Sequence, residues 1–268
     1  MSMRSIWRPI ARSATSARLS RHIVPRSPAR ATSPRGVSAF FSTAGQRMLK
    51  DQPDPDLNND EFQAYLDGNA AWAQSVTDKD PNFFTESAKA QYPTVLWIGC
   101  GDSRVPETTL LGLKPGDVFV HRNIANILHP SDLSSLSVIE FSVKYVGVKH
   151  VIVCGHTQCG GLIASMKNDR VGLIDSWLTP VRALRCKHAD ELDSLDTMDA
   201  KTKRLAELNV QNSLEVLKTN PIIIDAMRDR GLQIHGVVYN LATGKLEPLE
   251  TGESQEDFKK RIAAFETK

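Results

Sequence analysis

The chain has 268 residues, enough for one sizeable domain or two small ones with a proper core. Its 41% hydrophobic and 24% charged residues are ordinary for a globular protein, and no run approaches the ~18 consecutive apolar residues of a membrane span. The net charge of +2 conceals an asymmetry, because residues 1–50 hold nine arginines, one lysine and no acid. The remainder has 23 basic and 31 acidic residues, a net charge of −8, which argues against a nucleic-acid-binding surface.

The N-terminal segment has the composition of a mitochondrial transit peptide, rich in Arg, Ser, Ala and Pro and without acids. Its start can place Ile6, Trp7 and Ile10 on one helical face. The stretch 35–43 resembles the region before a matrix-peptidase cut, so we expect residues 1–44 to be a disordered, cleaved presequence and the mature protein to lie in the mitochondrial matrix. The alternatives are a basic tail that binds RNA or anionic lipid, and a chloroplast address.

After this segment the sequence predicts a linker and one domain. Residues 45–58 form a polar stretch with two prolines, and the domain over 59–268 opens on a helix, since apolar residues recur at spacings of three and four. Short apolar runs rich in β-branched residues then predict buried strands, which alternate with segments of helical periodicity. In chain order we expect a helix at 59–80, strands at 93–99 and 117–122, a helix at 133–146, a strand at 148–154, a helix after Gly161, helices near 173–185, 199–216 and 221–229, a strand at 232–240, an edge strand from Leu246 and a terminal helix at 254–265.

This alternation predicts an α/β fold with a mainly parallel central sheet flanked by helices. Ligands of such sheets collect at the carboxyl ends of the strands. Two motifs stand at these ends: Cys100-Gly-Asp-Ser-Arg104 follows the strand at 93–99, and His156-Thr-Gln-Cys159 follows the strand at 148–154. We therefore expect the two motifs to meet in space.

Together the motifs offer two thiolates and one imidazole, from Cys100, His156 and Cys159. This is the ligand set of a zinc site with an open fourth position, whereas a closed structural site would use four protein ligands. Taken alone, the pair of His156 and Cys159 is equally compatible with a buried cysteine beside a hydrogen-bonded histidine. Of the other cysteines, we expect Cys154 to pack as a small apolar residue and Cys186 to be a free thiol.

The first motif also carries a carboxylate and an arginine. Arg104 can hold Asp102 ionised and turned away from the metal, so that the carboxylate accepts the hydrogen bond of a hydroxide on the metal and leaves an oxygen lone pair aimed at the substrate. If released, Asp102 could become a fourth ligand. The alternative is an exposed ion pair worth ~0–1 kcal/mol. Gly160 and Gly161 place backbone N–H groups at the start of a helix, a position that favours anions, although a tight turn would also use them.

These residues resemble the β-class carbonic anhydrases, specifically a mitochondrial enzyme of eukaryotic, fungal type, with their fingerprint Cys-x-Asp-x-Arg and His-x-x-Cys. The resemblance spans about residues 55–250. It implies the β-carbonic anhydrase fold with an N-terminal helical arm that grips a neighbouring subunit, in homodimers or homotetramers. It also implies active sites at the dimer interface, where Phe83, Phe84 or Tyr92 could contribute to the pocket. Further blocks typical of the family lie at 69–73, 119–126, 172–177, 207–210 and 235–239.

The activity implied by the resemblance is the reversible hydration of CO2 to bicarbonate and a proton, with one Zn²⁺ per subunit. Hydroxide on the zinc attacks CO2 and is oriented by Asp102 and Arg104, while Val105, Gly160 and Gly161 border the substrate and anion pocket. No membrane or nucleic-acid partner is expected. Two rival functions share these ligands: hydrolysis of carbonyl sulfide or carbon disulfide, and a non-catalytic zinc-binding sensor of CO2 or bicarbonate.

One subfamily of these enzymes has a closed state at low pH, with the aspartate on zinc and bicarbonate in a separate pocket. Trp97, Arg122 and Tyr239 stand at the matching positions of this chain and form its candidate regulatory pocket. Phe141 departs from that subfamily, which tends to carry tyrosine there. The alternative is that Trp97 is a core residue and Arg122 part of a structural ion pair.

Overall fold

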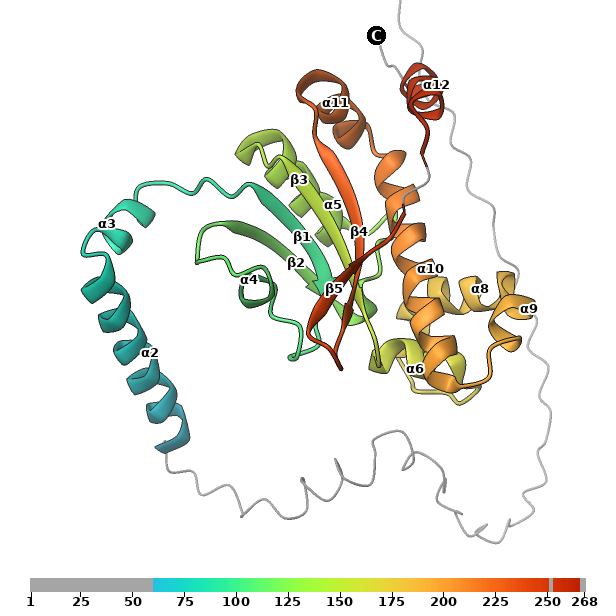
Figure 1. Ribbon diagram of the computed structural model, residues 1–268, viewed down its shortest axis with the longest axis horizontal. Helices are drawn as coiled ribbons and strands as arrows, with labels where there is room; N and C mark the ends of the chain where they lie inside the picture. The colour runs from blue at the N-terminus through green and yellow to red at the C-terminus, as the bar shows by residue number, and fades with distance from the viewer. Residues whose placement is uncertain (1–59, 251–252, 266–268) are drawn as a thin grey trace, which may run out of the picture. The chain divides into compact units, whose positions relative to one another are not determined.

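One five-stranded sheet organises the computed structural model, which describes residues 60–250 and 253–265 (Figure 1). The strand order is β2-β1-β3-β4-β5; the first four strands are parallel and β5 is antiparallel to β4. The mainly parallel α/β sheet predicted from the sequence is therefore confirmed, whereas the expected presequence and linker lie outside the described residues. The strands are β1 Val95–Cys100, β2 Val118–Asn123, β3 His150–His156, β4 Gln233–Asn240 and β5 Lys245–Pro248.

Helices occupy most of the predicted positions, with one local difference. The expected helix at 133–146 changes at Phe141 from α-helical to π-helical hydrogen bonding, and the N–H of Gly147 donates to the carbonyl of Ser142 five residues back. Several one-turn helices had no sequence signal, because four or five residues are too few to show a period. The helices are α2 Asp60–Lys79, α3 Phe83–Ser87, α4 Glu107–Leu110, η1 Ile124–Asn126, α5 Leu133–Glu140, η2 Phe141–Val146, α6 Gly160–Met166, α7 Ile174–Trp177, α8 Thr179–Lys187, α9 Ala189–Asp193, α10 Met198–Lys218, α11 Pro221–Arg230 and α12 Gln255–Phe265.

Capping residues explain where two of these helices begin. The side chain of Asp132 accepts hydrogen bonds from the backbone N–H groups of Ser134 and Ser135 at the start of α5. Asn220 caps α11 in the same way, and Pro221 follows at the first helical position, where its missing N–H has no consequence. Local sequence therefore sets these boundaries.

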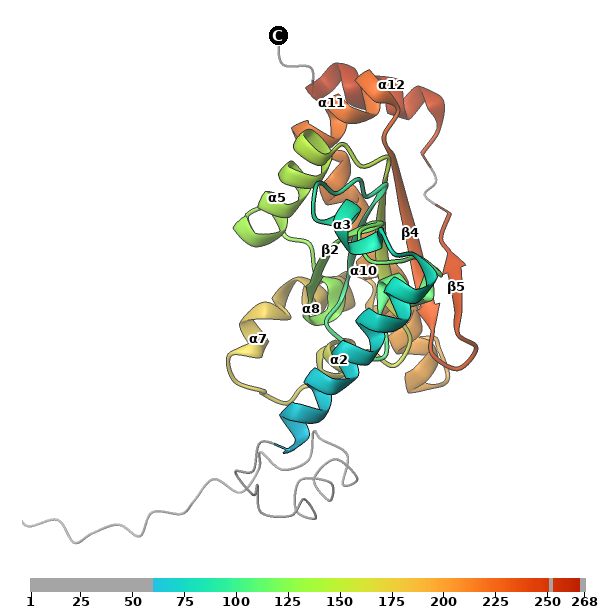
Figure 2. The same cartoon turned by 90° about the vertical axis from the view of Figure 1, so that its left-hand side faces the viewer.

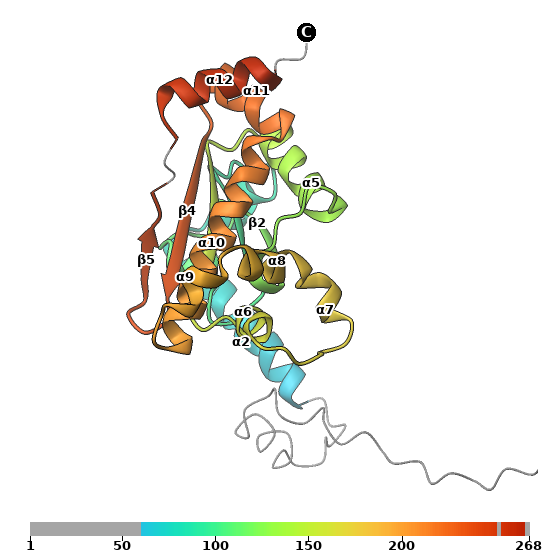
Figure 3. The same cartoon turned by 90° about the vertical axis from the view of Figure 1, so that its right-hand side faces the viewer.

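One face of the sheet carries the main core and packs on α5, α10 and α11 (Figure 3). Alternate strand residues such as Leu96, Val153 and Val238 point to this face and are fully buried. Gly236 allows α10 to lie close, because a Cβ there would come within 2.9 Å of the side chains of Val210 and Leu214. This packing holds β3 and β4 against α10 and so helps to position the carboxyl ends of both strands.

A second cluster lies beneath the carboxyl edge of the sheet and joins η1, α6, α8 and α10. It contains Cys100 and Cys159 together with Leu162, Leu178 and Leu205, all buried. Burial of each such leucine stabilises the fold by about 1.5–3 kcal/mol. The cysteines of the two motifs are therefore part of a packed interior.

The helix α2 leads away from the sheet, consistent with the expected N-terminal arm (Figure 2). None of its residues is buried, and Phe62, Tyr65, Leu66 and Trp72 are exposed. Its contact with α3 includes an edge-to-face pair of Trp72 and Phe84, with ring centroids 5.8 Å apart. Among the described residues, no helix is both long enough and apolar enough to cross a membrane.

Candidate metal centre

The sheet topology brings the two motifs to one place. The strands β1 and β3 are parallel neighbours, so their carboxyl ends lie at the same edge. Cys100 is the last residue of β1, His156 is the last residue of β3, and Cys159 is the residue directly before the first turn of α6. The two Sγ atoms are 4.0 Å apart, and all three ligand atoms lie within 4.8 Å of one another. The structure thus assembles the three residues that the sequence proposed as metal ligands.

The geometry of this triad fits zinc. Tetrahedral coordination with Zn–S bonds of ~2.3 Å places two sulfurs about 3.8 Å apart, close to the observed separation. Nδ1 of His156 lies 2.9 Å from the carbonyl oxygen of Thr157, so Nδ1 carries the proton and Nε2 has a free lone pair. That Nε2 atom is buried and has no hydrogen-bond partner among the residues that the structure describes. A buried nitrogen without a partner is costly in the absence of a ligand, and a metal ion would satisfy it.

The two cysteine thiols are electrostatically coupled. The hydrogen bond from Cys159 lowers the pKa of Cys100, and the same contact together with burial raises the pKa of Cys159. Two thiolates 4.0 Å apart therefore require a positive charge between them. Burial raises the pKa of Cys154 to about 12, and its thiol lies 3.1 Å from the carbonyl oxygen of Gly155, in keeping with its expected role as a small apolar residue. Cys186 is exposed.

Asp102 and Arg104 form a bidentate pair beside the triad. Nε of Arg104 donates to Oδ1 of Asp102 at 3.0 Å, Nη2 donates to Oδ2 at 2.8 Å, and the backbone N–H of Arg104 donates to Oδ1 at 3.0 Å. These hydrogen bonds lower the pKa of Asp102 to about 2, which keeps the carboxylate ionised. Its Oδ2 atom lies 3.9 Å from Nε2 of His156. Arg104 also reaches the carbonyl oxygen of Gln158 at 3.3 Å and so joins the two motif loops.

Arg122 on β2 holds the backbone of the first motif, residues 100–104, in place. Its Nε atom donates to the carbonyl oxygen of Cys100 at 2.7 Å, and Nη2 donates to the carbonyl oxygen of Asp102. Its Nη1 atom lies 3.6 Å from a carboxylate oxygen of Glu107. The sequence had suggested a regulatory role or a structural ion pair for Arg122. The contacts add a third function, the bracing of the backbone that carries a metal ligand.

The other residues of the expected regulatory pocket lie in a small buried cluster on the opposite face of the sheet from α10. Trp97 and Tyr239 pack there with Val105 and Cys154. Trp97 is fully buried, and within the described part of the chain its Nε1 atom has no hydrogen-bond partner. Val105 is also fully enclosed in this cluster.

Sequence reasoning assigned no role to three residues that hold the turn η1 beside the metal centre. This turn contains left-handed backbone at Ala125, with φ of 61°. Nδ2 of Asn209 on α10 donates to the carbonyl oxygen of Ala125 at 2.8 Å, and the indole N–H of Trp177 donates to that of Ile124 at 2.8 Å. Asn123 clamps the end of the turn, because its side chain both accepts from the N–H and donates to the carbonyl of Ile127. Asn123, Trp177 and Asn209 lie within the blocks at 119–126, 172–177 and 207–210 that are typical of the resembled family. Membership of these blocks was the sequence feature that could have pointed to them.

The two glycines after Cys159 differ in their surroundings. A Cβ atom at Gly161 would lie 3.1 Å from the Cβ of Ala125 and 3.2 Å from Ile124, so α6 packs directly on η1 there. A Cβ atom at Gly160 would meet nothing within 4 Å. Close packing therefore explains why position 161 needs a glycine, whereas position 160 has room for a larger side chain.

A mainly parallel α/β sheet carries a buried Cys–His–Cys triad at its carboxyl edge, with an arginine-paired carboxylate beside it, and this donor set is that of a zinc site with an open fourth position. The family model described as carbonic anhydrase matches residues 95–246 of this chain. The curated carbonic anhydrase of Emericella nidulans is 41% identical over 185 residues, which is 69% of this chain and 81% of that protein. The chain belongs to the carbonic anhydrase family.

Solved structures place it with the fungal β-class members. The crystal structure of a β-carbonic anhydrase of Aspergillus fumigatus has 48% identity and a TM-score of 0.75, and covers 78% of this chain and 100% of that one. A tetrameric β-carbonic anhydrase of Sordaria macrospora has 44% identity and a TM-score of 0.71, with 73% and 100% covered. A relative from Arabidopsis thaliana named as mitochondrial is 32% identical over 61% of this chain and 59% of its own length.

Proposed function

We propose that this chain catalyses the reversible hydration of CO2 to bicarbonate and a proton, with one Zn²⁺ held by Cys100, His156 and Cys159. The observation that carries the proposal is the buried, unpartnered Nε2 atom of His156, which converges with two sulfurs 4.0 Å apart in a chain of this family. When bound, zinc supplies a Lewis acid that lowers the pKa of its water to about 7.

The role of Asp102 follows from its hydrogen bonds. The carboxylate is ionised at neutral pH, and its Oδ2 atom lies within 4 Å of the ligand nitrogen of His156. It therefore stands where it can accept a hydrogen bond from the attacking water and fix the direction of the lone pair that meets CO2. Because Arg104 binds both carboxylate oxygens, Asp102 cannot turn toward the ligands without losing these two hydrogen bonds.

The function is tested by stopped-flow CO2 hydration on zinc-loaded protein, with zinc content measured on the same samples. We expect Asp102→Asn to lower turnover about 100-fold or more while zinc stays stoichiometric. Asp117→Asn is the matched control: the carboxylate of Asp117 accepts a hydrogen bond from the backbone N–H of Lys114, at the amino end of β2 and away from the triad. Stoichiometric zinc without CO2 hydration in the unmodified protein would overturn the proposal.

The same preparation separates the rival functions. Assays with carbonyl sulfide and carbon disulfide test the alternative hydrolase, since the ligands would be identical. Zinc binding and bicarbonate binding without turnover would indicate a sensor. The intact pair of Asp102 and Arg104 favours an enzyme, because a sensor has no need of an ionised carboxylate beside the open ligand position.

The proposal includes a homodimer or homotetramer. The tetrameric relative from Sordaria macrospora supports it, as does the row of apolar residues along α2 that the rest of residues 60–250 and 253–265 leaves exposed. Sedimentation of the mature chain tests the assembly, and a concentration-independent monomer would refute it.

We further propose import into the mitochondrial matrix, supported by the arginine-rich, acid-free segment 1–44. N-terminal mass spectrometry of the protein from isolated mitochondria tests both import and cleavage.

Regulation by bicarbonate at Trp97, Arg122 and Tyr239 is a finer part of the proposal. It is supported by the buried indole N–H of Trp97, a donor that has no partner. The expected signature is activity that falls cooperatively as the pH drops. A single, non-cooperative titration of activity would contradict it.

A further inference from the structure

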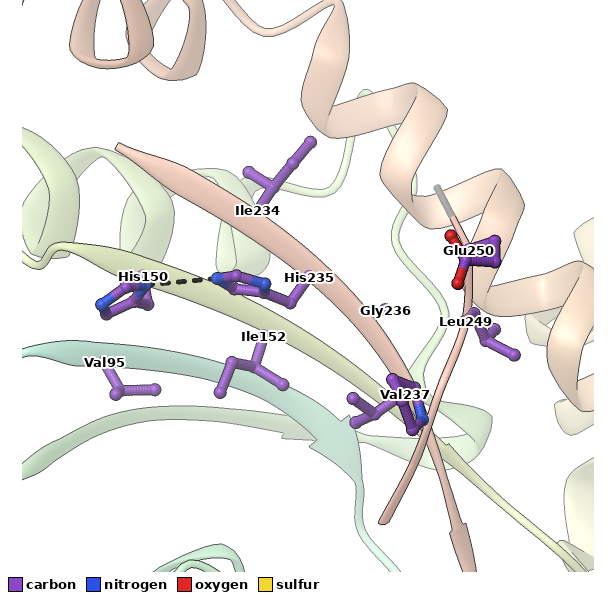
Figure 4. Close-up of a pocket in the computed structure, with 10 residues that line it drawn as sticks. Val95, His150, Ile152, Ile234, His235, Gly236, Val237, Leu249 and Glu250 are labelled. Atoms are coloured by element: carbon purple, nitrogen blue, oxygen red, sulfur yellow. Dashed lines mark hydrogen bonds between the residues drawn. The ribbon is translucent and has the colours of Figure 1, made fainter. Parts of the chain in front are cut away.

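Two imidazoles that the proposed reaction does not use face each other on the sheet. His150 begins β3, and His235 lies on the neighbouring strand β4, where it pairs in register with Ile152. Both side chains project from the sheet face opposite α10. Nδ1 of His150 lies 3.2 Å from Nε2 of His235, with the ring centroids 5.3 Å apart and the ring planes inclined by 41° (Figure 4).

The pair is open to solutes. It borders a cavity of about 430 Å³ between the sheet face and the segment after β5. Both histidines are partly exposed, and the remaining walls are mostly apolar, including Val95, Ile152 and Val237 (Figure 4). A small hydrated ion can therefore reach the two nitrogens without any movement of the strands.

The separation of the nitrogens matches a shared metal ion. Zinc–nitrogen bonds of 2.0–2.1 Å place two ligand nitrogens about 2.9 Å apart at an angle of 90° and about 3.4 Å apart at the tetrahedral angle. The observed 3.2 Å lies between these limits. We propose that His150 and His235 form a second site for a transition-metal dication that favours imidazole, such as Zn²⁺, with water completing the coordination.

This site is separate from the catalytic triad. His150 and His156 stand six residues apart at opposite ends of β3, which corresponds to about 20 Å at ~3.3 Å per residue. The two sites share no ligand, so each can be removed without the other. With two protein ligands in place of three, the second site binds zinc more weakly than the triad and fills after it.

The competing explanation is a simple hydrogen bond between the two rings, in which one nitrogen donates and the other accepts. Amide side chains distinguish the two. In His150→Asn an amide takes the place of Nδ1, and in His235→Gln an amide takes the place of Nε2. Either variant retains a hydrogen-bonding group and removes a strong metal ligand.

The test is equilibrium dialysis of the zinc-loaded full chain against rising concentrations of free Zn²⁺, with bound zinc measured by mass spectrometry. We expect two zinc ions per chain, and an affinity for the second that falls at least tenfold in His150→Asn and in His235→Gln. His188→Asn is the matched control, because His188 is a partly exposed histidine paired with Glu191 on another part of the chain and should leave the second ion bound. Binding of only one ion, or unchanged binding of the second in both variants, would overturn the proposal.

A second measurement does not depend on the variants. The ¹⁵N resonances of the two imidazoles in the unmodified protein should shift when zinc is added beyond the first equivalent. If both resonances stay in place while zinc binds elsewhere, the pair is a hydrogen bond and the second site does not exist.

Discussion

A methyl group added at Gly161 tests how closely α6 packs on the turn η1. The new Cβ atom would lie 3.1 Å from the Cβ of Ala125, 3.2 Å from Ile124 and 3.4 Å from Leu178, distances at which the neighbours must shift. Overpacking of this kind costs about 1–3 kcal/mol. For a domain of 150–250 residues, that corresponds to a loss of roughly 2–12 °C in Tm. Gly161→Ala should therefore be clearly destabilised.

Gly160→Ala is the matched control, one residue earlier in the same helix. A Cβ atom there meets nothing within 4 Å, and alanine has a higher helix propensity than glycine by up to ~1 kcal/mol. We expect this variant to be neutral or slightly more stable. Thermal unfolding of both zinc-loaded variants provides the comparison. If Gly161→Ala is as stable as Gly160→Ala, the packing of α6 on η1 does not constrain this position and the reasoning fails.

Three further predictions concern the surroundings of the site and the stability of the chain. Asn209→Ala should lower the free energy of unfolding by about 1–3 kcal/mol, because it leaves the buried carbonyl of Ala125 without a partner; urea denaturation measures this. Removal of zinc with a chelator should lower Tm by roughly 5–11 °C, since a ligand at 100 times its Kd stabilises the folded state by about 2.7 kcal/mol. The hydrogen bonds from Arg261 lower the pKa of Glu253 in the folded protein. This pair therefore stabilises the fold above the unfolded pKa of ~4.3, and the stabilisation is lost as the pH falls through the lower folded pKa. Glu253→Gln should flatten the acid side of a plot of Tm against pH, and an unchanged acid side would contradict the assignment.

The braces of the metal centre come from distant parts of the chain. The backbone of the first motif is held by Arg122 from β2, and the turn η1 is held by Trp177 and by Asn209 from α10. Each uses a side-chain donor on a main-chain carbonyl, so each fixes backbone position without occupying the open ligand site. We therefore expect variants of these residues to change the geometry and stability of the centre before they change its chemistry.

Local sequence determined much of this protein. The apolar runs before Cys100 and His156 predict the two strands, and the motif residues at their ends predict the ligand set, because parallel neighbours present their carboxyl ends at one edge. The helix starts expected at 133 and 221 are likewise confirmed, and the structure shows them capped by Asp132 and Asn220. These features depend on periodicity and on interactions over three or four residues, which a sequence displays directly.

Tertiary structure decided the rest. The left-handed turn at Ala125 is stabilised by Asn209, 84 residues away, and no local pattern in an alanine-containing segment predicts it. The approach of His150 to His235 depends on the register between β3 and β4, and these residues are 85 positions apart. Both strands pack on α10, and Gly236 leaves room for the helix there. Contacts of this kind arise only when the whole core has formed, because their energy comes from side chains that the sequence keeps far apart.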